Sequence, residues 1–271
     1  MTRLAGKNLW VIGPGRLGRS FAALLDGAGA QVVLLGRKSF LPASPPAGVL
    51  LTVPDHAIRE VAQKLTHFPF PRGTPVLHTS GAVEVDALTL LADRGCSTGG
   101  LHPLVAVPNP VDGVRLLRNA WWGVEGEGPA FALASRVVAS ADGRTLRIPP
   151  GGRALYHAAA VLASNYLLAL LSVAEGVMVR GGIPAEQGRE ALANLAAGAL
   201  TAVRDTGPLD ALTGPVVRGD LETVRAHLAR LSDGERDVYC ALGREAVGLA
   251  RQRGLDEGAA AALQTLLGGS A

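Results

Sequence analysis

A short apolar run followed by three regularly spaced glycines restricts the fold of this chain more than any other feature. Residues 9–12 are apolar and lead into Gly13, and Gly15 and Gly18 complete a G-x-G-x-x-G pattern. Apolar residues at helical spacing follow within residues 21–25. A strand, a tight turn and a helix in this order are typical of a dinucleotide site: the first glycine forms the turn, the second admits the pyrophosphate and the third lets the helix pack closely on the strand. The helix N-terminus then offers N–H groups and the positive end of its dipole to the phosphates.

We expect the site to include Gly13, Pro14, Gly15, Arg16, Leu17 and Gly18. The alternative is an ordinary glycine-rich turn in a chain that holds 35 glycines.

The next segment indicates which dinucleotide binds. Residues 31–35 are predicted to form a second strand, and Gly36, Arg37, Lys38 and Ser39 follow it. An acidic residue about 20 positions beyond the glycines would bind the ribose 2′-OH of NAD, whereas arginine accommodates the 2′-phosphate of NADP. No Asp or Glu stands here, and Arg37 could also stack on adenine. The sequence therefore predicts NADP(H) in preference to NAD(H), unless these residues form only a solvated basic turn.

Strand and helix patterns alternate through the rest of the first half. Three prolines within residues 40–48 exclude a regular helix there, and Asp55 is predicted to cap the helix that follows. Alternation of this kind indicates an α/β fold with a doubly wound, mostly parallel sheet, a Rossmann sheet. The predicted strands are 49–53, 74–78, 98–101, 121–125 and 145–148, and the predicted helices are 57–65, 84–94 and 129–141.

Polar residues stand where several of these strands end. Ligands of open α/β sheets bind outside the carboxyl ends of the strands. His78 and His102 could carry protons there because histidine titrates near neutrality, or they could simply bind backbone groups. We assign His102 to the substrate. The residues expected to continue the cofactor site are Val53, Pro54, Asp55, Thr79 and Ser80.

The second half reads as helices only. The run 149–152, Pro-Pro-Gly-Gly, breaks the α/β pattern, so we place a dinucleotide-binding domain at 1–150 and an all-α domain at 151–271. Ser232 and Glu235 form a predicted capping box. The predicted helices are 153–180, 184–204, 220–231, 232–253 and 256–267.

The first of these helices is unusually apolar. Residues 155–174 carry no formal charge and are long enough to span a bilayer. Polar groups within them, among them His157, Ser164 and Asn165, favour a buried helix of a soluble protein instead. Such a helix must be covered nearly all round, so we expect a partner subunit and hence a homodimer. At helical spacing His157 and Asn165 share one stripe, where they could face the nicotinamide or be satisfied by a neighbouring helix.

A second informative stretch is the loop 212–220. Thr213, Gly214 and Arg218 offer a hydroxyl, free N–H groups and a guanidinium, which suit a carboxylate or phosphate. The alternative is an ordinary helix connection in which Arg218 pairs with Asp220. We expect these residues to bind an anionic group of a small substrate.

Composition excludes several other classes. The chain of 271 residues is 48% hydrophobic with a net charge of +3 and has no Lys/Arg run, so disorder and nucleic-acid binding are not expected. Its two cysteines, Cys96 and Cys240, lie far apart, and no Cys/His cluster has metal spacing. Free thiols and the lack of a signal-peptide pattern indicate a cytoplasmic protein without a membrane anchor.

Together these motifs resemble a known family. The sequence is similar to Rossmann-like proteins with a DUF2520 C-terminal domain, relatives of pyrroline-5-carboxylate reductase, ketopantoate reductase and the 6-phosphogluconate dehydrogenase group. The resemblance covers nearly the whole chain and implies a nicotinamide-binding domain, a helical dimerising domain and a cleft between them. The motifs that carry it are residues 13–18, 53–55, 78–81, 102–103, 156–160 with Asn165, 212–215 and 218–220.

The sequence departs from the wider group at one position. β-Hydroxyacid dehydrogenases of that group place a lysine four residues before an asparagine on the first helix of the second domain. Val161 stands four residues before Asn165 here, and the last lysine of the chain is Lys64. The general-acid role of that lysine therefore cannot be transferred. His157 is the expected substitute, with Asn165 holding the reacting atom.

These observations lead to one principal hypothesis and two alternatives. The chain is expected to be an NADP-dependent oxidoreductase that transfers a hydride between the nicotinamide and a small anionic carbonyl or imine substrate. It could instead be a dinucleotide-binding dimer without turnover, such as a redox sensor or a partner-binding protein. A third possibility keeps the enzyme but replaces the cofactor, for instance with a deazaflavin.

Overall fold

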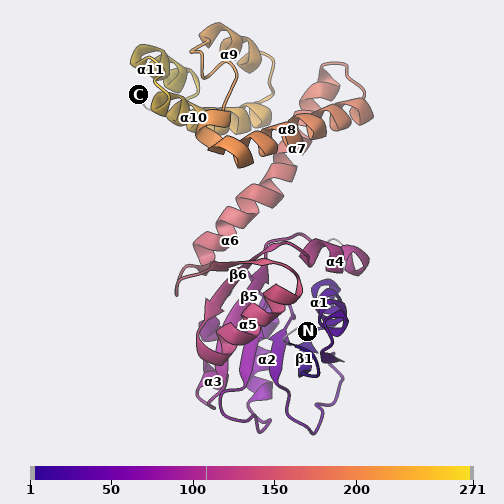
Figure 1. Cartoon of the computed structure of the whole chain (residues 1–271). Helices are drawn as coiled ribbons and strands as arrows, with labels where there is room; N and C mark the ends of the chain where they lie inside the picture. Colours follow the sequence, from indigo (N-terminus) through magenta and orange to yellow (C-terminus); the bar gives the residue numbers. More distant parts are fainter. Residues whose placement is uncertain (1–3, 108, 269–271) are drawn as a thin grey trace. The chain divides into compact units, whose positions relative to one another are not determined.

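A computed structural model describes residues 4–107 and 109–268 of the chain (Figure 1). The chain divides into two compact units, Met1–Ser164 and Asn165–Ala271. The sequence break at 149–152 precedes this division by about one helix, because helix α6 (Arg153–Val161) still belongs to the first unit.

The first unit is built on a seven-stranded sheet in the order β2-β1-β3-β4-β5-β6-β7. All neighbouring strands are parallel except β5 and β6, which are antiparallel. The order reverses between β1 and β3, and this is the switch point at which an open α/β sheet binds its ligand. The strands are β1 (Asn8–Ile12), β2 (Gln31–Leu35), β3 (Gly48–Leu51), β4 (Pro75–His78), β5 (Ser97–Pro103), β6 (Trp121–Gly126) and β7 (Arg144–Arg147).

Helices cover both faces of this sheet and enclose two separate cores. On one face, α1 (Arg16–Gly27) and α5 (Gly128–Ser140) bury Phe21, Leu24 and Leu133 against the strands. On the other face, α2 (Ile58–Leu65) and α3 (Thr89–Ala92) enclose a second core with Trp10 and Leu51. The apolar spacing of α1 is therefore explained by burial of a single stripe, as for an amphipathic helix.

Several elements of the first unit differ from the sequence prediction. Asp55 does not cap α2; it opens a 3₁₀ turn, η1 (Asp55–Ala57), and α2 starts after it without a side-chain cap. The predicted helix 84–94 is two short pieces, η2 (Val85–Leu88) and α3. Helix α4 (Pro110–Leu117) was not predicted, although the Asn109 side chain caps it by accepting from the Asp112 N–H. A proline in its first turn is compatible with such a start.

In the described residues of the second unit, all regular secondary structure is helical. The predicted capping box of Ser232 and Glu235 is present, and Asp220 and Asp256 cap the helices that follow them. Gly207 interrupts α8 with a φ of 81°, so the predicted helix from 184 ends close to that glycine. The helices are α7 (Leu167–Arg180), α8 (Ala185–Ala211), α9 (Leu221–Leu228), α10 (Asp233–Gln252) and α11 (Glu257–Leu266).

The apolar helix predicted at 153–180 has two unexpected properties. A π-helical turn, η3 (Leu162–Tyr166), separates α6 from α7, so the 3.6-residue spacing used to align His157 with Asn165 does not hold through it. The segment Arg153–Arg180 has a mean hydropathy of 1.6 over its most apolar window, none of which is buried, and it is long and apolar enough to cross a membrane. The single chain does not bury this segment, so the expectation that it is covered nearly all round depends on the predicted partner subunit. The exposed apolar residues include Leu155, Leu162, Leu168 and Val179.

Candidate cofactor site

The glycine turn after β1 has no room for side chains at two of its three glycines. Gly13 has a φ of 120°, and a Cβ there would lie 2.7 Å from the Thr52 carbonyl. A Cβ on Gly18 would overlap the carbonyl oxygen of Gly13. A Cβ on Gly15, which is the N-cap of α1, would meet nothing within 4 Å. The first and third glycines therefore pack the turn, and the second leaves its outer side open to a ligand.

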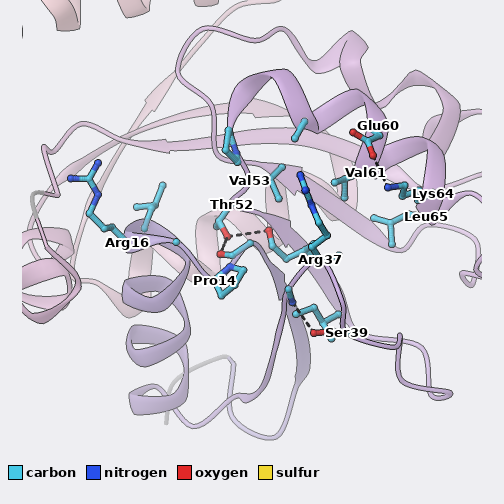
Figure 2. Close-up of a pocket in the computed structure, with 18 of the residues that line it drawn as sticks. Pro14, Arg16, Arg37, Ser39, Thr52, Val53, Glu60, Val61, Lys64 and Leu65 are labelled. Carbon is cyan, nitrogen blue, oxygen red and sulfur yellow. Dashed lines mark hydrogen bonds and ion pairs between the residues drawn. The ribbon is translucent and has the colours of Figure 1, made fainter.

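Thr52 holds this turn in place and was not identified from the sequence. Its side-chain hydroxyl lies 2.8 Å from the carbonyl oxygen of Gly13 and 3.1 Å from that of Ile12, so one proton is shared between two acceptors. Thr52 follows β3 directly, at the switch point of the sheet. Figure 2 shows these contacts beside Pro14.

A cavity of about 830 Å³ opens above the turn. Its size suits a small-molecule or cofactor site. It runs from the end of β2, past α1, to His102 at the end of β5. The lining residues are Ile12, Gly13, Pro14, Gly15, Arg16, Leu17, Leu35, Gly36, Arg37, Ser39, Leu41, Thr52, Val53, Pro54, Ala57, Glu60, Val61, Lys64, Leu65, His102, Pro103, Val105 and Val107.

The end of the cavity at β2 is basic. The Gly36 N–H donates to the Ser39 side-chain hydroxyl at 2.9 Å, and the Ser39 N–H donates to the Gly36 carbonyl at 3.1 Å, which closes a tight turn around Arg37. The Arg37 side chain extends from this turn toward α2 (Figure 2). In the described part of the chain it makes no hydrogen bond or ion pair. An exposed guanidinium beside a hydroxyl is suited to a phosphate.

Helix α2 adds a charged pair to the same end. The Lys64 ammonium lies 2.5 Å from Glu60 Oε1, one helical turn away, and both residues line the cavity. Bonding to Lys64 is the main cause that lowers the pKa of Glu60, and the charge of Arg37 contributes a smaller part. Sequence reasoning missed both residues, because their role depends on how α2 packs beside β2 and not on a motif.

The opposite end of the cavity carries His102 and its neighbours on α6. His102 Nδ1 lies 2.9 Å from the Tyr156 hydroxyl, and the rings of His102 and His157 are 6.1 Å apart. A Cβ on Gly81 would come within 2.6 Å of His157 and 3.0 Å of His102, so the glycine allows both rings to approach the loop after β4. Burial, with the charges of His157 and Arg153, lowers the pKa of His102 to about 4. The imidazole of His102 is therefore neutral at pH 7.

Below this end lies a buried polar cluster. Arg153 donates to Glu125 Oε2 at 2.6 Å and to the Ser80 carbonyl at 2.5 Å, and its second terminal nitrogen has no hydrogen-bond partner. His78 is also fully buried, with both ring nitrogens unpartnered. Burial, together with the charge of Arg153, lowers the pKa of His78 to about 3. His78 is fully buried and does not line the cavity, so it is not placed to exchange protons there; His157 does not line the cavity either, but it is only partly buried.

The structure brings most of the predicted cofactor residues to one cavity. Gly18 lies beneath the turn, and Lys38 and Asp55 are exposed beside the cavity and do not line it. Thr79 and Ser80 are buried and serve the local fold: Thr79 donates to the Leu51 carbonyl, and Ser80 accepts from two following N–H groups. The predicted residues that line the cavity are Gly13, Pro14, Gly15, Arg16, Leu17, Gly36, Arg37, Ser39, Val53, Pro54 and His102.

Apart from His157, which lies on α6 in the first unit, the other predicted site residues belong to the second unit. Asn165, Thr213 and Arg218 are exposed there, and Gly214 has a φ of 100° that suits glycine. Asp220 accepts from the Thr223 N–H at 3.0 Å and from the Thr223 hydroxyl at 2.7 Å. The alternative interpretation paired Arg218 with Asp220; the hydrogen bonds from Thr223 lower the pKa of Asp220, and the charge of Arg218 contributes a smaller part. Among the described residues, no group of three or more acidic, histidine or cysteine side chains could hold a metal ion.

Comparisons with known proteins agree with this architecture. Residues 120–246 match DUF2520, a domain of unknown function, and residues 41–103 match a Rossmann-like domain. A comparison with curated proteins gives no match.

Solved structures resemble the chain over nearly its whole length. Protein TM1727 from Thermotoga maritima has a TM-score of 0.70 at 20% identity, covering 90% of this chain and 99% of that one. Protein BF3122 from Bacteroides fragilis, provisionally named an NADP oxidoreductase, has a TM-score of 0.65 at 18% identity. The match covers 91% of this chain and 97% of that one. A reductive aminase from Aspergillus terreus, in complex with NADPH and ethyl-5-oxohexanoate, has a TM-score of 0.57 at 18% identity, with 97% and 93% covered. These likenesses establish a shared fold, and the matched segments identify a Rossmann-like domain at residues 41–103 and a DUF2520 domain at residues 120–246.

Proposed function

We propose that the protein is an NADP-dependent oxidoreductase acting on a small anionic carbonyl or imine compound. One observation carries the proposal: a single cavity joins the glycine turn of Gly13 to the exposed cation of Arg37. The glycine turn and the start of α1 suit a pyrophosphate. Arg37 and Ser39 suit the 2′-phosphate, and the end of β2 offers no acidic residue for a ribose diol.

The fold neighbours support the reaction class. The Aspergillus terreus reductive aminase was crystallised with NADPH, and a pyrroline-5-carboxylate reductase from Coxiella burnetii shares the fold at a TM-score of 0.55. Both names describe reduction of a carbon–nitrogen double bond or of its carbonyl precursor. By analogy we extend that chemistry to this chain.

NADPH, when bound, supplies a hydride to the carbon of a C=O or C=N bond. We propose that His157 donates or orients the proton that completes the alcohol or amine. Its ring beside Gly81 and near His102 supports this role. Asn165 is proposed to hold the reacting oxygen or nitrogen. The residues proposed to bind the anionic group of the substrate are His102, Thr213, Gly214 and Arg218.

Turnover tests the proposed reaction directly. Purified protein would be incubated with NADPH and a panel of 2-oxo acids and carboxylate-bearing cyclic imines, and NADPH absorbance would be followed. With an active compound, we expect His157→Ala to lower kcat about 100-fold or more, as loss of a general acid does. His67→Ala serves as the control, because His67 is exposed and does not line the cavity. Full turnover by His157→Ala would show that the proton comes from elsewhere.

A dinucleotide-binding protein without turnover is the second candidate. The exposed apolar helix faces favour it, because they are suited to contacts with another chain. That candidate predicts tight NADPH binding together with no NADPH oxidation by any member of the panel.

A further inference from the structure

The basic end of the cavity contains an acidic group that the proposed NADP preference does not require. Glu60 and Lys64 lie one turn apart on α2, both line the cavity, and their charged atoms are 2.5 Å apart. Arg37 reaches toward the same helix from the turn after β2 (Figure 2). A ligand phosphate at this end would therefore meet two cations and one carboxylate.

The carboxylate already has a partner. Its bond to Lys64, and then the charge of Lys64, lower the pKa of Glu60, so Glu60 is ionised at neutral pH. Both side chains are largely exposed, with 63% and 69% of their surfaces accessible for Glu60 and Lys64. An exposed pair of this kind is weak in water, because solvent screens it and both side chains lose freedom. It can be exchanged for a stronger contact.

A 2′-phosphate would provide that contact. A phosphate carries up to two negative charges and three acceptor oxygens, and hydrogen bonds between ions are stronger than neutral ones. The ammonium of Lys64 has three donors, so it could turn from the carboxylate to the phosphate or bind both. Glu60 would remain nearby and would repel the phosphate. The ribose hydroxyl of NAD, being neutral, would meet no such repulsion and would gain little from Lys64.

We propose that Glu60 and Lys64 determine how strongly the site discriminates between NADP and NAD. Lys64 is the second cation for the 2′-phosphate after Arg37, and Glu60 limits the preference by pairing with Lys64 and repelling the phosphate. This inference rests on the proposed function, because it requires the adenosine end of the dinucleotide to lie beside β2 and α2.

Calorimetric titration of the full chain with 2′,5′-ADP and with 5′-AMP separates the 2′-phosphate from the rest of the dinucleotide. The variants are Lys64→Met, Glu60→Gln and the double variant. Arg59→Gln and Asp86→Asn are matched controls: they remove one charge of each sign from an ion pair of 3.1 Å that also involves α2, and neither residue lines the cavity. Titrations at low and high salt report how strongly charged groups contribute to nucleotide binding.

We expect Lys64→Met to weaken 2′,5′-ADP binding about ten-fold while changing 5′-AMP binding less than about two-fold, as for loss of one charged hydrogen bond. Glu60→Gln should strengthen 2′,5′-ADP binding about three-fold or more and increase its salt dependence, again with little change for 5′-AMP. In the double variant the gain from Glu60→Gln should shrink, because part of it depends on the freed Lys64.

Two results would overturn the inference, and they can be told apart. If the wild-type chain prefers 2′,5′-ADP but the Glu60 and Lys64 variants match their controls, discrimination lies elsewhere and the proposed function stands. If the wild-type chain binds neither nucleotide nor NADPH, the proposed function fails and the inference fails with it.

Discussion

At the scale of single residues, His78 is the least expected group in the first unit. It is fully buried, neither ring nitrogen has a partner, and its pKa is lowered from 6.5 to about 3, first by burial. The unfolded chain therefore takes up a proton near pH 6.5, whereas the folded chain does so only near pH 3. Between these values the unfolded state holds more protons, so the free energy of unfolding falls as the pH is lowered.

Replacing His78 with phenylalanine should remove this pH dependence. We expect His78→Phe to be at least as stable as wild type at pH 7, because two unpartnered polar atoms leave the core. Between pH 6 and pH 4 the free energy of unfolding of the variant should fall less steeply than that of wild type. The two slopes should differ by about 1.4 kcal/mol per pH unit. Urea denaturation at a series of pH values measures both the free energy of unfolding at pH 7 and its slope with pH. His78→Leu covers the case in which the larger ring does not fit, and an unchanged slope in both variants would contradict the account.

At the scale of secondary-structure elements, Arg153 joins the start of α6 to the sheet. Its side chain reaches between Glu125 on β6 and the Ser80 carbonyl after β4, and its backbone N–H donates to Glu84 at 3.2 Å. A side chain at Gly100 on β5 would overlap the guanidinium, so the glycine makes this buried contact possible. A buried ion pair is costly to break, because the remaining charge loses its partner.

We therefore expect Arg153→Met to destabilise the chain by about 3–5 kcal/mol. Glu125→Gln in the same chain should recover part of the loss, because the uncompensated carboxylate is then neutral. Denaturant unfolding of the single and double variants measures the coupling. A double variant no more stable than Arg153→Met alone would show that the pairing of Arg153 with Glu125 is not what stabilises this junction.

The elements predicted best from the sequence are those with local signals. Strand β2 was predicted with its observed bounds, and helices were predicted to begin at Asp220 and Asp256, which cap α9 and α11. Helix α4 was not predicted because its apolar pattern is short, although Asn109 and Pro110 are typical of a helix start. The π-turn η3 has no sequence signature comparable to a cap.

In the candidate site, too, the residues that could be predicted are those with local sequence signals. The glycine turn and Arg37 were found because the motif and its spacing are local. Thr52, Glu60 and Lys64 were not, because they reach the cavity from β3 and α2 only after the sheet has formed. No spacing rule along the chain connects Lys64 with Arg37.

At the scale of the whole molecule, the exposed apolar surface of the helices is suited to contact with another protein chain. Leu168, Leu195 and Leu200 are 56–71% exposed, and a chain rarely leaves several large apolar side chains in water. We propose that a second copy of the chain covers the helical unit, as a homodimer.

Light scattering coupled to size-exclusion chromatography should therefore give twice the chain mass of 27.8 kDa. Leu168→Glu with Leu195→Glu should shift the protein toward monomer, because charges at a buried interface are costly. The exposed but polar Gln63→Glu in the first unit is the control. A monomeric wild-type chain at micromolar concentration would contradict the proposal.

The central claim is that the cavity above Gly13 binds NADP(H) in preference to NAD(H), and ligand-dependent thermal stability tests it most directly. Tm would be recorded with NADPH, NADP, NADH and NAD at equal concentrations, since a ligand that binds the native state raises its stability, and at equal concentration the tighter ligand raises it more. We predict clearly larger shifts for NADPH and NADP than for NADH and NAD, and loss of that difference in Arg37→Gln. Equal shifts for the phosphorylated and unphosphorylated nucleotides, or no shift with any of the four, would contradict the account.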